Sequence, residues 1–258
     1  ELNFIKKEYS RLRRTLIENA EEAVYKEKEV EEMDVIFLMD RFGYAKTIDV
    51  STYERNKEAA DSENKYVLRC KNIGRICLFT DTGMLHTIKV SDLPYGKFRD
   101  KGTPIDNVSN YNSEKEQIIC LTSQTELNLY QLAFVTAQSM MKLVSGGEFD
   151  VAKRTVAATK LGEGDTLVSV RVLHEEQDIV LSTKEGYFLR FPLSEIPEKK
   201  KNAIGVRGMK LGAKDNVHEC YYLGSQEENT ILLNEKPFDL NNLRCNKRDG
   251  RGSKPKQG

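Results

Sequence analysis

The sequence predicts an all-β fold in which one hairpin unit is used several times, as in a propeller. Four segments share an apolar, β-branched run, a short polar turn and a second alternating run; they are residues 34–50, 74–91, 132–146 and 178–194. Their turn positions Gly43, Gly83, Ser139 and Gly186 are spaced by 40, 56 and 47 residues. A repeat of this length indicates one supersecondary unit that buries its apolar face against its neighbours. We therefore expect the function to lie on a surface that the repetition creates.

The first strand of each unit is apolar on both faces. In the first unit Val35, Phe37 and Met39 alternate with Ile36 and Leu38. A strand of this kind is buried on both faces, which suits an inner strand of a propeller-like blade. The turn that follows usually contains the glycine that a tight hairpin needs at positive φ.

Each hairpin is followed by a polar loop and then by a closing strand. We expect loops at residues 53–66, 95–107, 149–166 and 197–216. The closing strands are predicted at residues 66–70, 117–122, 167–174 and 217–224. A fifth, less regular unit begins at residues 230–234, so the sequence predicts a repeat domain over residues 34–258.

Residues 1–33 differ from the repeats and are predicted to form a short connector. Apolar residues at Phe4, Ile5, Tyr9 and Leu12 suit one face of a helix, and a glutamate-rich stretch follows. Because the chain begins at Glu1 rather than at methionine, we expect it to be part of a longer protein.

The composition argues against several classes of protein. No apolar run reaches about 18 residues, so no membrane-spanning helix is predicted, and no signal peptide is visible. Five cysteines without a C-x-x-C motif and three scattered histidines favour reduced thiols in the cytoplasm and no metal site. The chain has no Walker A loop, G-x-S-x-G or H-E-x-x-H motif, so we predict neither a catalytic residue nor a cofactor.

The net charge of zero hides a strong segregation of charge. Residues 184–214 hold eight basic and three acidic side chains, and residues 239–258 hold six basic and two acidic ones. A local basic stripe matters more to a polyanion than the total charge does. The sequence therefore allows a nucleic-acid binder despite its 40 basic and 40 acidic side chains.

Glycine recurs beside lysine and arginine in the loops. Glycine lets a backbone approach a phosphate, and the flanking cations release counterions from a nucleic acid. Loops that share one rim would form a basic track on which a duplex bends with little reading of its sequence. The predicted DNA-binding residues are Arg41, Lys46, Lys97, Arg99, Lys101, Lys142, Lys153, Arg154, Lys160, Arg190, Lys199, Lys200, Lys201, Arg207, Lys210, Lys247, Arg248 and Arg251.

Two other functions are compatible with a propeller-like fold. A single loop of this kind is also typical of a solvated turn, with no role in binding. The alternative function for the whole domain is a platform for protein–protein interaction. Binding to such a platform would centre on apolar or acidic surface and depend weakly on salt. A stand-alone enzyme with a site in a central channel is disfavoured, because no catalytic motif is present.

Several segments resemble the C-terminal part of the A subunit of bacterial type IIA topoisomerases, gyrase and topoisomerase IV. Residues 13–17 resemble the R-R-T-x-I segment that ends the family's breakage-reunion region, and residues 34–47 resemble its first DNA-facing hairpin. Residues 204–212 resemble its G-V-x-G-M-K-L stretch. The resemblance implies a β-pinwheel, a propeller-like disc of about five four-stranded blades that exchange strands, with a basic rim that wraps DNA.

The resemblance also implies which activities lie outside this chain. The family's catalytic tyrosine lies in the breakage-reunion region, and its ATPase lies on the B subunit, so ATP and Mg²⁺ are used elsewhere in an ATP-dependent type II topoisomerase. The implied partners are duplex DNA, the rest of the A subunit and the B subunit. The implied state is a monomeric fragment in the cytoplasm, associated with the nucleoid.

One departure from the family concerns the first unit. Gyrase carries the box Q-R-R-G-G-R-G after its first hairpin, whereas residues 53–63 here hold four acids, two bases and no glycine. Residues 199–209 and 248–255 are partly box-like but belong to the fourth and fifth units. We therefore expect a weak track at the first blade and a parent enzyme more like topoisomerase IV than supercoiling gyrase.

Overall fold

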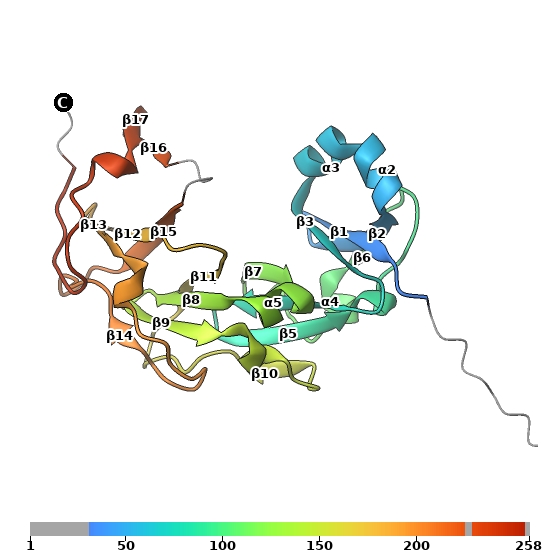
Figure 1. Ribbon diagram of the computed structural model, residues 1–258, viewed down its shortest axis with the longest axis horizontal. Coiled ribbons are helices and arrows are strands. Elements are labelled where there is room, and N and C mark those ends of the chain that lie inside the picture. The colour runs from blue at the N-terminus through green and yellow to red at the C-terminus, as the bar shows by residue number, and fades with distance from the viewer. Residues whose placement is uncertain (1–30, 225–228, 256–258) are drawn as a thin grey trace, which may run out of the picture. The chain divides into compact units, whose positions relative to one another are not determined.

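The computed structural model describes residues 31–224 and 229–255, so the predicted connector lies almost wholly outside the described residues. Within them, the predicted hairpin recurs along the chain (Figure 1). The hairpins are β1 (Asp34–Asp40) with β2 (Tyr44–Asp49), β4 (Arg75–Thr80) with β5 (Met84–Lys89), β8 (Gln131–Thr136) with β9 (Met140–Ser145), β12 (Asp178–Thr183) with β13 (Phe188–Pro192), and β16 (Thr230–Leu233) with β17 (Lys236–Asp239).

The four predicted turn positions share one backbone conformation. The φ angle is +84° at Gly43, +80° at Gly83, +64° at Ser139 and +84° at Gly186. Ser139 adopts this conformation although it carries a side chain, and its buried hydroxyl accepts the backbone N–H of Met209 at 2.8 Å. The equivalence of the four turns is therefore confirmed.

A closing strand pairs with the first strand of each of the first four hairpins, as predicted. These strands are β3 (Asn64–Lys71), β7 (Ile118–Ser123), β11 (Leu167–Leu173) and β15 (Val217–Leu223). β7 contacts both β3 and β11, and β11 contacts β15. The closing strands of successive units therefore neighbour one another.

The remaining strand of each sheet comes from the next unit along the chain. β6 (Thr103–Pro104) follows β5 but pairs with β2, β10 (Thr155–Ala157) follows β9 but pairs with β5, and β14 (Val206–Arg207) follows β13 but pairs with β9. Ser253 forms the equivalent bridge to Phe188 in β13. We call these exchanged pieces return strands. Their exchange is the pattern of a β-pinwheel, in which three of the described sheets have four strands.

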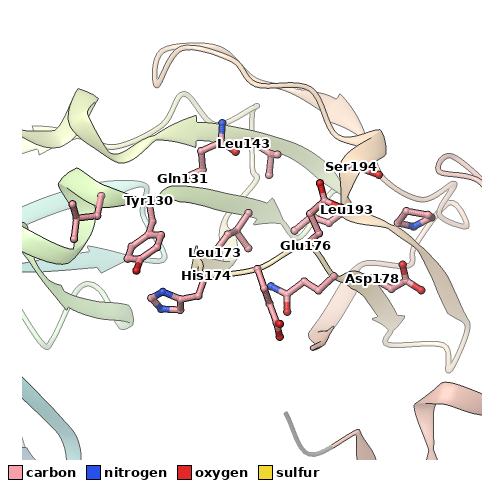
Figure 2. A pocket seen from close by; sticks show the side chains of 13 residues that line it. Tyr130, Gln131, Leu143, Leu173, His174, Glu176, Asp178, Leu193 and Ser194 are labelled. Atoms are coloured by element: carbon pink, nitrogen blue, oxygen red, sulfur yellow. The ribbon is translucent and has the colours of Figure 1, made fainter. Parts of the chain in front are cut away.

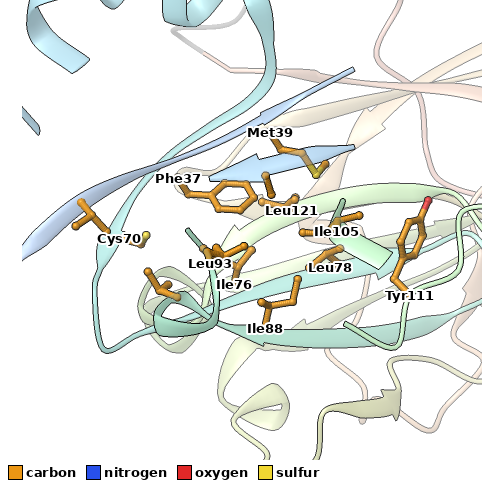
Figure 3. Packing of buried hydrophobic residues seen from close by; sticks show 13 residues of the cluster. Phe37, Met39, Cys70, Ile76, Leu78, Ile88, Leu93, Ile105, Tyr111 and Leu121 are labelled. Atoms are coloured by element: carbon orange, nitrogen blue, oxygen red, sulfur yellow. The ribbon is translucent and has the colours of Figure 1, made fainter. Parts of the chain in front are cut away.

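Apolar clusters fill the space between successive sheets, and β4 illustrates how they form. Ile76 and Leu78 point from β4 toward Phe37 of the first sheet (Figure 3). Cys77 and Phe79 point the other way and join the cluster shared with the third sheet. Burial of one large apolar side chain stabilises a fold by about 1.5–3 kcal/mol. A first strand that contributes to two clusters must be apolar on both faces, as its sequence is.

A helical turn follows the second strand of every hairpin in the described part of the chain. After β2 this turn is a pair of short helices, α2 (Val50–Arg55) and α3 (Lys57–Glu63), where the sequence analysis placed a loop. Ala60 of α3 is fully buried in one cluster with Ile36 and Leu38, so the helices cover the face of β1 turned away from the second sheet. The other helical elements are η1 (Val90–Asp92), α4 (Ile105–Val108), α5 (Gln124–Leu129), η2 (Gly146–Phe149), η3 (Leu193–Glu195) and η4 (Leu240–Asn242).

Three return strands begin beside a glycine that no other residue can replace without strain. A Cβ at the glycine would lie close to a backbone oxygen of the preceding hairpin: 2.4 Å from Ala45 at Gly102, 2.3 Å from Met141 at Gly205, and 2.5 Å from Phe188 at Gly252. These glycines let the return backbone lie against the neighbouring strand. This packing role is one that the sequence did not predict, and the approach of a phosphate to these loops stays a prediction.

The first prediction is that Gly205→Ala destabilises the fold. Residue 205 combines a φ of +103° with a carbonyl oxygen inside the space of the new Cβ. Backbone strain of this kind costs about 1–3 kcal/mol, which urea denaturation of the purified domain would measure. Gly147→Ala is the control, because the nearest atom to its Cβ is the Ser145 Oγ at 3.8 Å. Equal stability of the two variants would contradict the packing role.

Candidate nucleic-acid interface

Most of the predicted basic residues lie on the stretches that carry the return strands. We call these stretches, residues 93–117, 150–166, 196–216 and 243–255, the return segments. In each four-stranded sheet the return strand and the closing strand occupy opposite edges. The predicted cations therefore gather at the return edge, which is the same edge of every sheet.

Exposure divides the predicted residues into two groups. Thirteen are exposed and form the candidate interface, which we call the basic edge: Arg41, Lys97, Arg99, Lys101, Lys153, Arg154, Lys160, Lys199, Lys200, Arg207, Lys210, Lys247 and Arg251. The other five are partly or fully buried: Lys46, Lys142, Arg190, Lys201 and Arg248.

Lys142 on β9 is an anchor for the neighbouring return segment. Its side chain is 1% exposed, and its ammonium donates to the carbonyls of Lys201 at 2.5 Å, Ala203 at 2.6 Å and Lys200 at 3.4 Å. Three acceptors match the three N–H bonds of an ammonium. Burial lowers the pKa of Lys142 to about 8, against an opposing effect of Glu148, so the group is still charged at neutral pH. Lys142 therefore does not reach a phosphate, which corrects the prediction for this residue.

Lys46 and Arg190 are the corresponding anchors in the first and fourth sheets. The Lys46 ammonium donates to the carbonyl of Asp100 at 2.7 Å, and burial lowers its pKa. The Arg190 guanidinium donates to the carbonyl of Asn241 at 2.8 Å and pairs with Asp178 at 2.9 Å. Both cations therefore hold the chain of the following unit, and the prediction that they bind DNA is corrected in the same way.

A histidine occupies this place in the second sheet. His86 is 3% exposed, with Nδ1 at 3.1 Å from the Thr155 hydroxyl and Nε2 at 2.9 Å from the Glu116 carboxylate. Thr155 belongs to the return strand β10, so this contact again joins two units. The polar or basic residue three or four positions after each turn is thus an anchor, a role that the sequence analysis missed although the repeated spacing pointed to it.

Several cations of the basic edge pair with acids at the surface. Arg154 lies 3.2 Å from Asp92, and Lys200 lies 3.2 Å from Glu148 while its side chain remains 87% exposed. Exposed pairs of this kind contribute about 0–1 kcal/mol, so a phosphate can compete for the cation. Lys201 differs, because both its backbone N–H and its ammonium donate to Glu148, which makes it part of the loop structure.

The first unit has no counterpart of the basic return segments. Its loop positions are taken by α2 and α3, where Glu58, Asp61 and Glu63 are exposed. The Asp61 carboxylate accepts the Tyr53 hydroxyl at 2.8 Å, which ties the two helices together. An acidic helical surface replaces a basic glycine loop at this position.

A different surface feature lies between the third and fourth units. A hollow of about 640 Å³ has Tyr130, His174 and Glu176 in its wall. Figure 2 shows these side chains. The Tyr130 ring packs edge-on against His174 at 4.5 Å between centroids, and His174 lies 3.1 Å from Glu126. Glutamates at the rim make this hollow unsuited to a phosphate backbone.

Neither a metal cluster nor a membrane-spanning helix is found among the described residues. No group of three or more histidine, cysteine, aspartate or glutamate side chains is placed to hold a metal ion there. None of the helices within residues 31–224 and 229–255 is long and apolar enough to cross a bilayer.

Comparison with known proteins identifies relatives along most of the chain. A family model described as DNA gyrase C-terminal domain, beta-propeller, matches residues 130–174 and 177–218, which are the third and fourth units. The DNA gyrase A subunit of Lawsonia intracellularis is 27% identical over 245 residues, which cover 90% of this chain. The DNA gyrase A subunit of Clostridium acetobutylicum is 28% identical over 221 residues, which cover 81%. This chain spans 30% and 26% of the lengths of these two relatives.

A solved structure shares the fold. The crystal structure of the C-terminal domain of DNA topoisomerase IV superposes with a TM-score of 0.75 at 24% sequence identity. The superposition covers 86% of this chain and 72% of that chain. The all-β, propeller-like fold predicted from the hairpin repeat, and the β-pinwheel that the resemblance implied, are thereby confirmed.

The second prediction is that Lys142→Met destabilises the domain and that the loss grows above pH 8. The variant leaves buried carbonyls without a donor, at a cost of at least about 1 kcal/mol at pH 7. The pKa of Lys142 is about 8 when folded and 10.5 when unfolded, so the unfolded chain binds more protons in that window. Between these two pKa values the free energy of unfolding of the wild type therefore rises with pH. Lys142→Met lacks this rise because residue 142 no longer titrates.

Urea denaturation at pH 7 and pH 9.5 measures this difference. The exposed Lys199 is the control, and Lys199→Ala should shift stability equally at both pH values. A Lys142→Met variant whose stability runs parallel to that of the wild type across the window would show that Lys142 is not a buried cation.

Proposed function

We propose that this chain is a C-terminal domain of a bacterial type IIA topoisomerase A subunit and that it binds and bends duplex DNA along its basic edge. The observation that carries the proposal is the placement of exposed cations at the return edge of successive sheets. The return segment of each unit places its lysine and arginine side chains at the edge of the preceding sheet. Positive charge therefore recurs from one sheet to the next.

Contacts of this kind recognise the phosphate backbone and not the bases. Lysine and arginine ends that reach phosphates position a duplex without reading its sequence. A duplex that follows cations from one sheet to the next has to bend, and the ion pairs that its phosphates form along the way offset the bending energy. We therefore propose binding without sequence specificity, with a preference for easily bent DNA.

In the parent enzyme the domain would present DNA segments for strand passage. The matched A subunits are more than three times as long as this chain, and we place the cleavage chemistry in the part outside it. The proposed partners are duplex DNA, the rest of the A subunit and the ATPase B subunit, which would use ATP and Mg²⁺. We propose a non-catalytic, monomeric fragment that works at the nucleoid in the cytoplasm.

The first unit favours topoisomerase IV-like activity over negative supercoiling. A handed wrap needs DNA to be held at the first blade, but α2 and α3 place Glu58, Asp61 and Glu63 there. Carboxylates repel phosphates, and a helix offers no glycine backbone for close approach. We propose that the track is weak at the first unit and strong at the third and fourth return segments.

A second candidate function rests on the hollow beside Tyr130. Its glutamates and exposed Leu129 suit a basic, partly apolar protein segment better than DNA. Binding by such a platform would depend weakly on salt. Salt dependence therefore separates the two functions.

The third prediction is that the domain binds linear duplex DNA with a steep dependence on salt. Neutralising about six phosphates gives a slope of log K against log salt concentration near about −5. Replacing Lys199, Lys200 and Lys210 together by alanine should make that slope shallower by about 2–3 and weaken binding to all sequences alike. An electrophoretic shift or fluorescence anisotropy across a salt series measures both effects.

The matched control removes the same charge away from the basic edge. Lys57, Lys65 and Arg69 are exposed on α3 and on the closing strand β3, outside the return segments. Their triple alanine variant should keep most of the affinity and the slope, and both triple variants should keep the wild-type Tm. Affinity that stays flat between low and moderate salt would favour the protein-interaction platform instead.

The fourth prediction concerns the direction of topological change. The complete A subunit that contains this domain, combined with its B subunit and ATP, should relax and decatenate plasmid DNA but introduce few negative supercoils. Gel electrophoresis of a relaxed plasmid, with a supercoiling gyrase as the positive control, tests this. Efficient accumulation of negatively supercoiled plasmid would show that another loop closes the wrap.

A further inference from the structure

Phe42 is the most exposed large apolar side chain in residues 31–224 and 229–255. It is 81% exposed at the tip of the β1–β2 hairpin, between Arg41 and Gly43. Burial of a phenylalanine stabilises a protein by about 1.5–3 kcal/mol. Because Phe42 is exposed, it does not make this contribution to the stability of the domain. The exposure is therefore a feature that packing within the domain does not explain.

The hairpin tip holds Phe42 away from the rest of the domain. The Asp40 carboxylate accepts the backbone N–H of Phe42 at 2.8 Å and that of Tyr44 at 3.0 Å. The Asp40 carbonyl accepts the N–H of Gly43 at 3.2 Å, and Gly43 has a φ of +84°. A tip restrained by three hydrogen bonds loses little conformational entropy when its side chain enters another molecule.

The equivalent tips do not need an apolar residue. The position before the turn residue is Thr82, Gln138 and Glu185 in the second, third and fourth hairpins. These hairpins have the same backbone conformation at the turn, so a polar side chain at the position before the turn residue is compatible with the fold. Phe42 is thus specific to the first unit and is not part of the repeat.

Two cations, Arg41 and Lys101, lie near the tip on the side of the return strand. Arg41 is exposed beside Phe42, and the Lys101 ammonium lies 4.4 Å from the centre of the Tyr44 ring. Lys101 leads into β6, which pairs with β2. An apolar side chain flanked by cations has the chemistry of a wedge, because the cations hold phosphates while the ring enters the base stack.

We propose that Phe42 inserts between two base pairs of the bound duplex and kinks it at the first unit. This inference rests on the proposed function, because it requires DNA on the basic edge. Insertion partly unstacks one base step and buries the ring that the fold leaves in water. Pyrimidine–purine steps unstack most easily, so Phe42 would select flexible steps without a hydrogen bond to any base.

The chain contains no tryptophan, which makes a direct test possible. In the 258-residue chain with Phe42→Trp, the single indole should lose at least half of its emission when duplex DNA binds and become protected from acrylamide. The control is Ile73→Trp, since Ile73 is 55% exposed in the turn between β3 and β4, away from the basic edge. Its emission should stay unchanged at the same DNA saturation.

Phe42→Ala separates the wedge from a phosphate contact. Loss of one aromatic stack should weaken binding roughly 5- to 100-fold and reduce the bend, measured by energy transfer between the ends of a labelled duplex. The salt slope should stay as in the wild type because no cation is removed. Arg41→Ala should instead make the slope shallower by about 0.9. Both variants should keep the wild-type Tm, since both side chains are exposed.

The outcomes distinguish this inference from the proposed function. A wild-type chain that does not bind duplex DNA overturns both. Wild-type binding with a steep salt slope, combined with unquenched Phe42→Trp and unchanged affinity and bend in Phe42→Ala, overturns the wedge alone. Quenching in Phe42→Trp together with a lost bend in Phe42→Ala establishes it.

Discussion

The fold depends on a polar anchor that each sheet extends to the next unit. Lys46, His86, Lys142 and Arg190 stand three or four positions after their turns, and each contacts the chain of a later unit. A buried charge is costly unless its donors are satisfied, and here the acceptors are mainly carbonyls that lie far along the chain. Each anchor therefore stabilises a sheet only when the return segment of the next unit is in place, which couples neighbouring units.

The same coupling positions the candidate interface. Return segments pair with the preceding sheet over two or three residues, which is too little to hold a loop by itself. The anchors and the close glycine contacts at Gly102, Gly205 and Gly252 fasten the backbone. With the backbone fastened, lysine and arginine side chains on either side of it remain free to face solvent. The anchoring cations therefore lie on the second strands of the hairpins, whereas the cations proposed to bind DNA lie mainly on the return segments.

The first described sheet is covered differently from the sheets in the middle of the repeat, and this difference affects the proposed function. In the first described sheet, α2 and α3 cover the face turned away from the second sheet, and Ala60 is buried there against Ile36 and Leu38. The exposed side of α3 carries Glu58, Asp61 and Glu63, so the proposed track weakens where these helices cover the first sheet. Phe42 lies at the tip of that same sheet beside Arg41 and Lys101, so the proposed wedge would add an apolar contact to the few cations of the first unit.

The sequence by itself determined the hairpin units, their turns and the closing strands, because alternation, glycine spacing and β-branched runs are local signals. It also placed most of the exposed cations. Only the tertiary structure decided that Lys142 is an anchor and Arg207 a surface residue, since a lysine in an alternating strand has the same pattern whether its ammonium meets a phosphate or a carbonyl. The roles of Gly205 and of α2 and α3 were likewise decided by tertiary contacts, with Met141 for the glycine and with β1 for the helices. These contacts join residues that are distant in the chain, so no local sequence pattern predicts them.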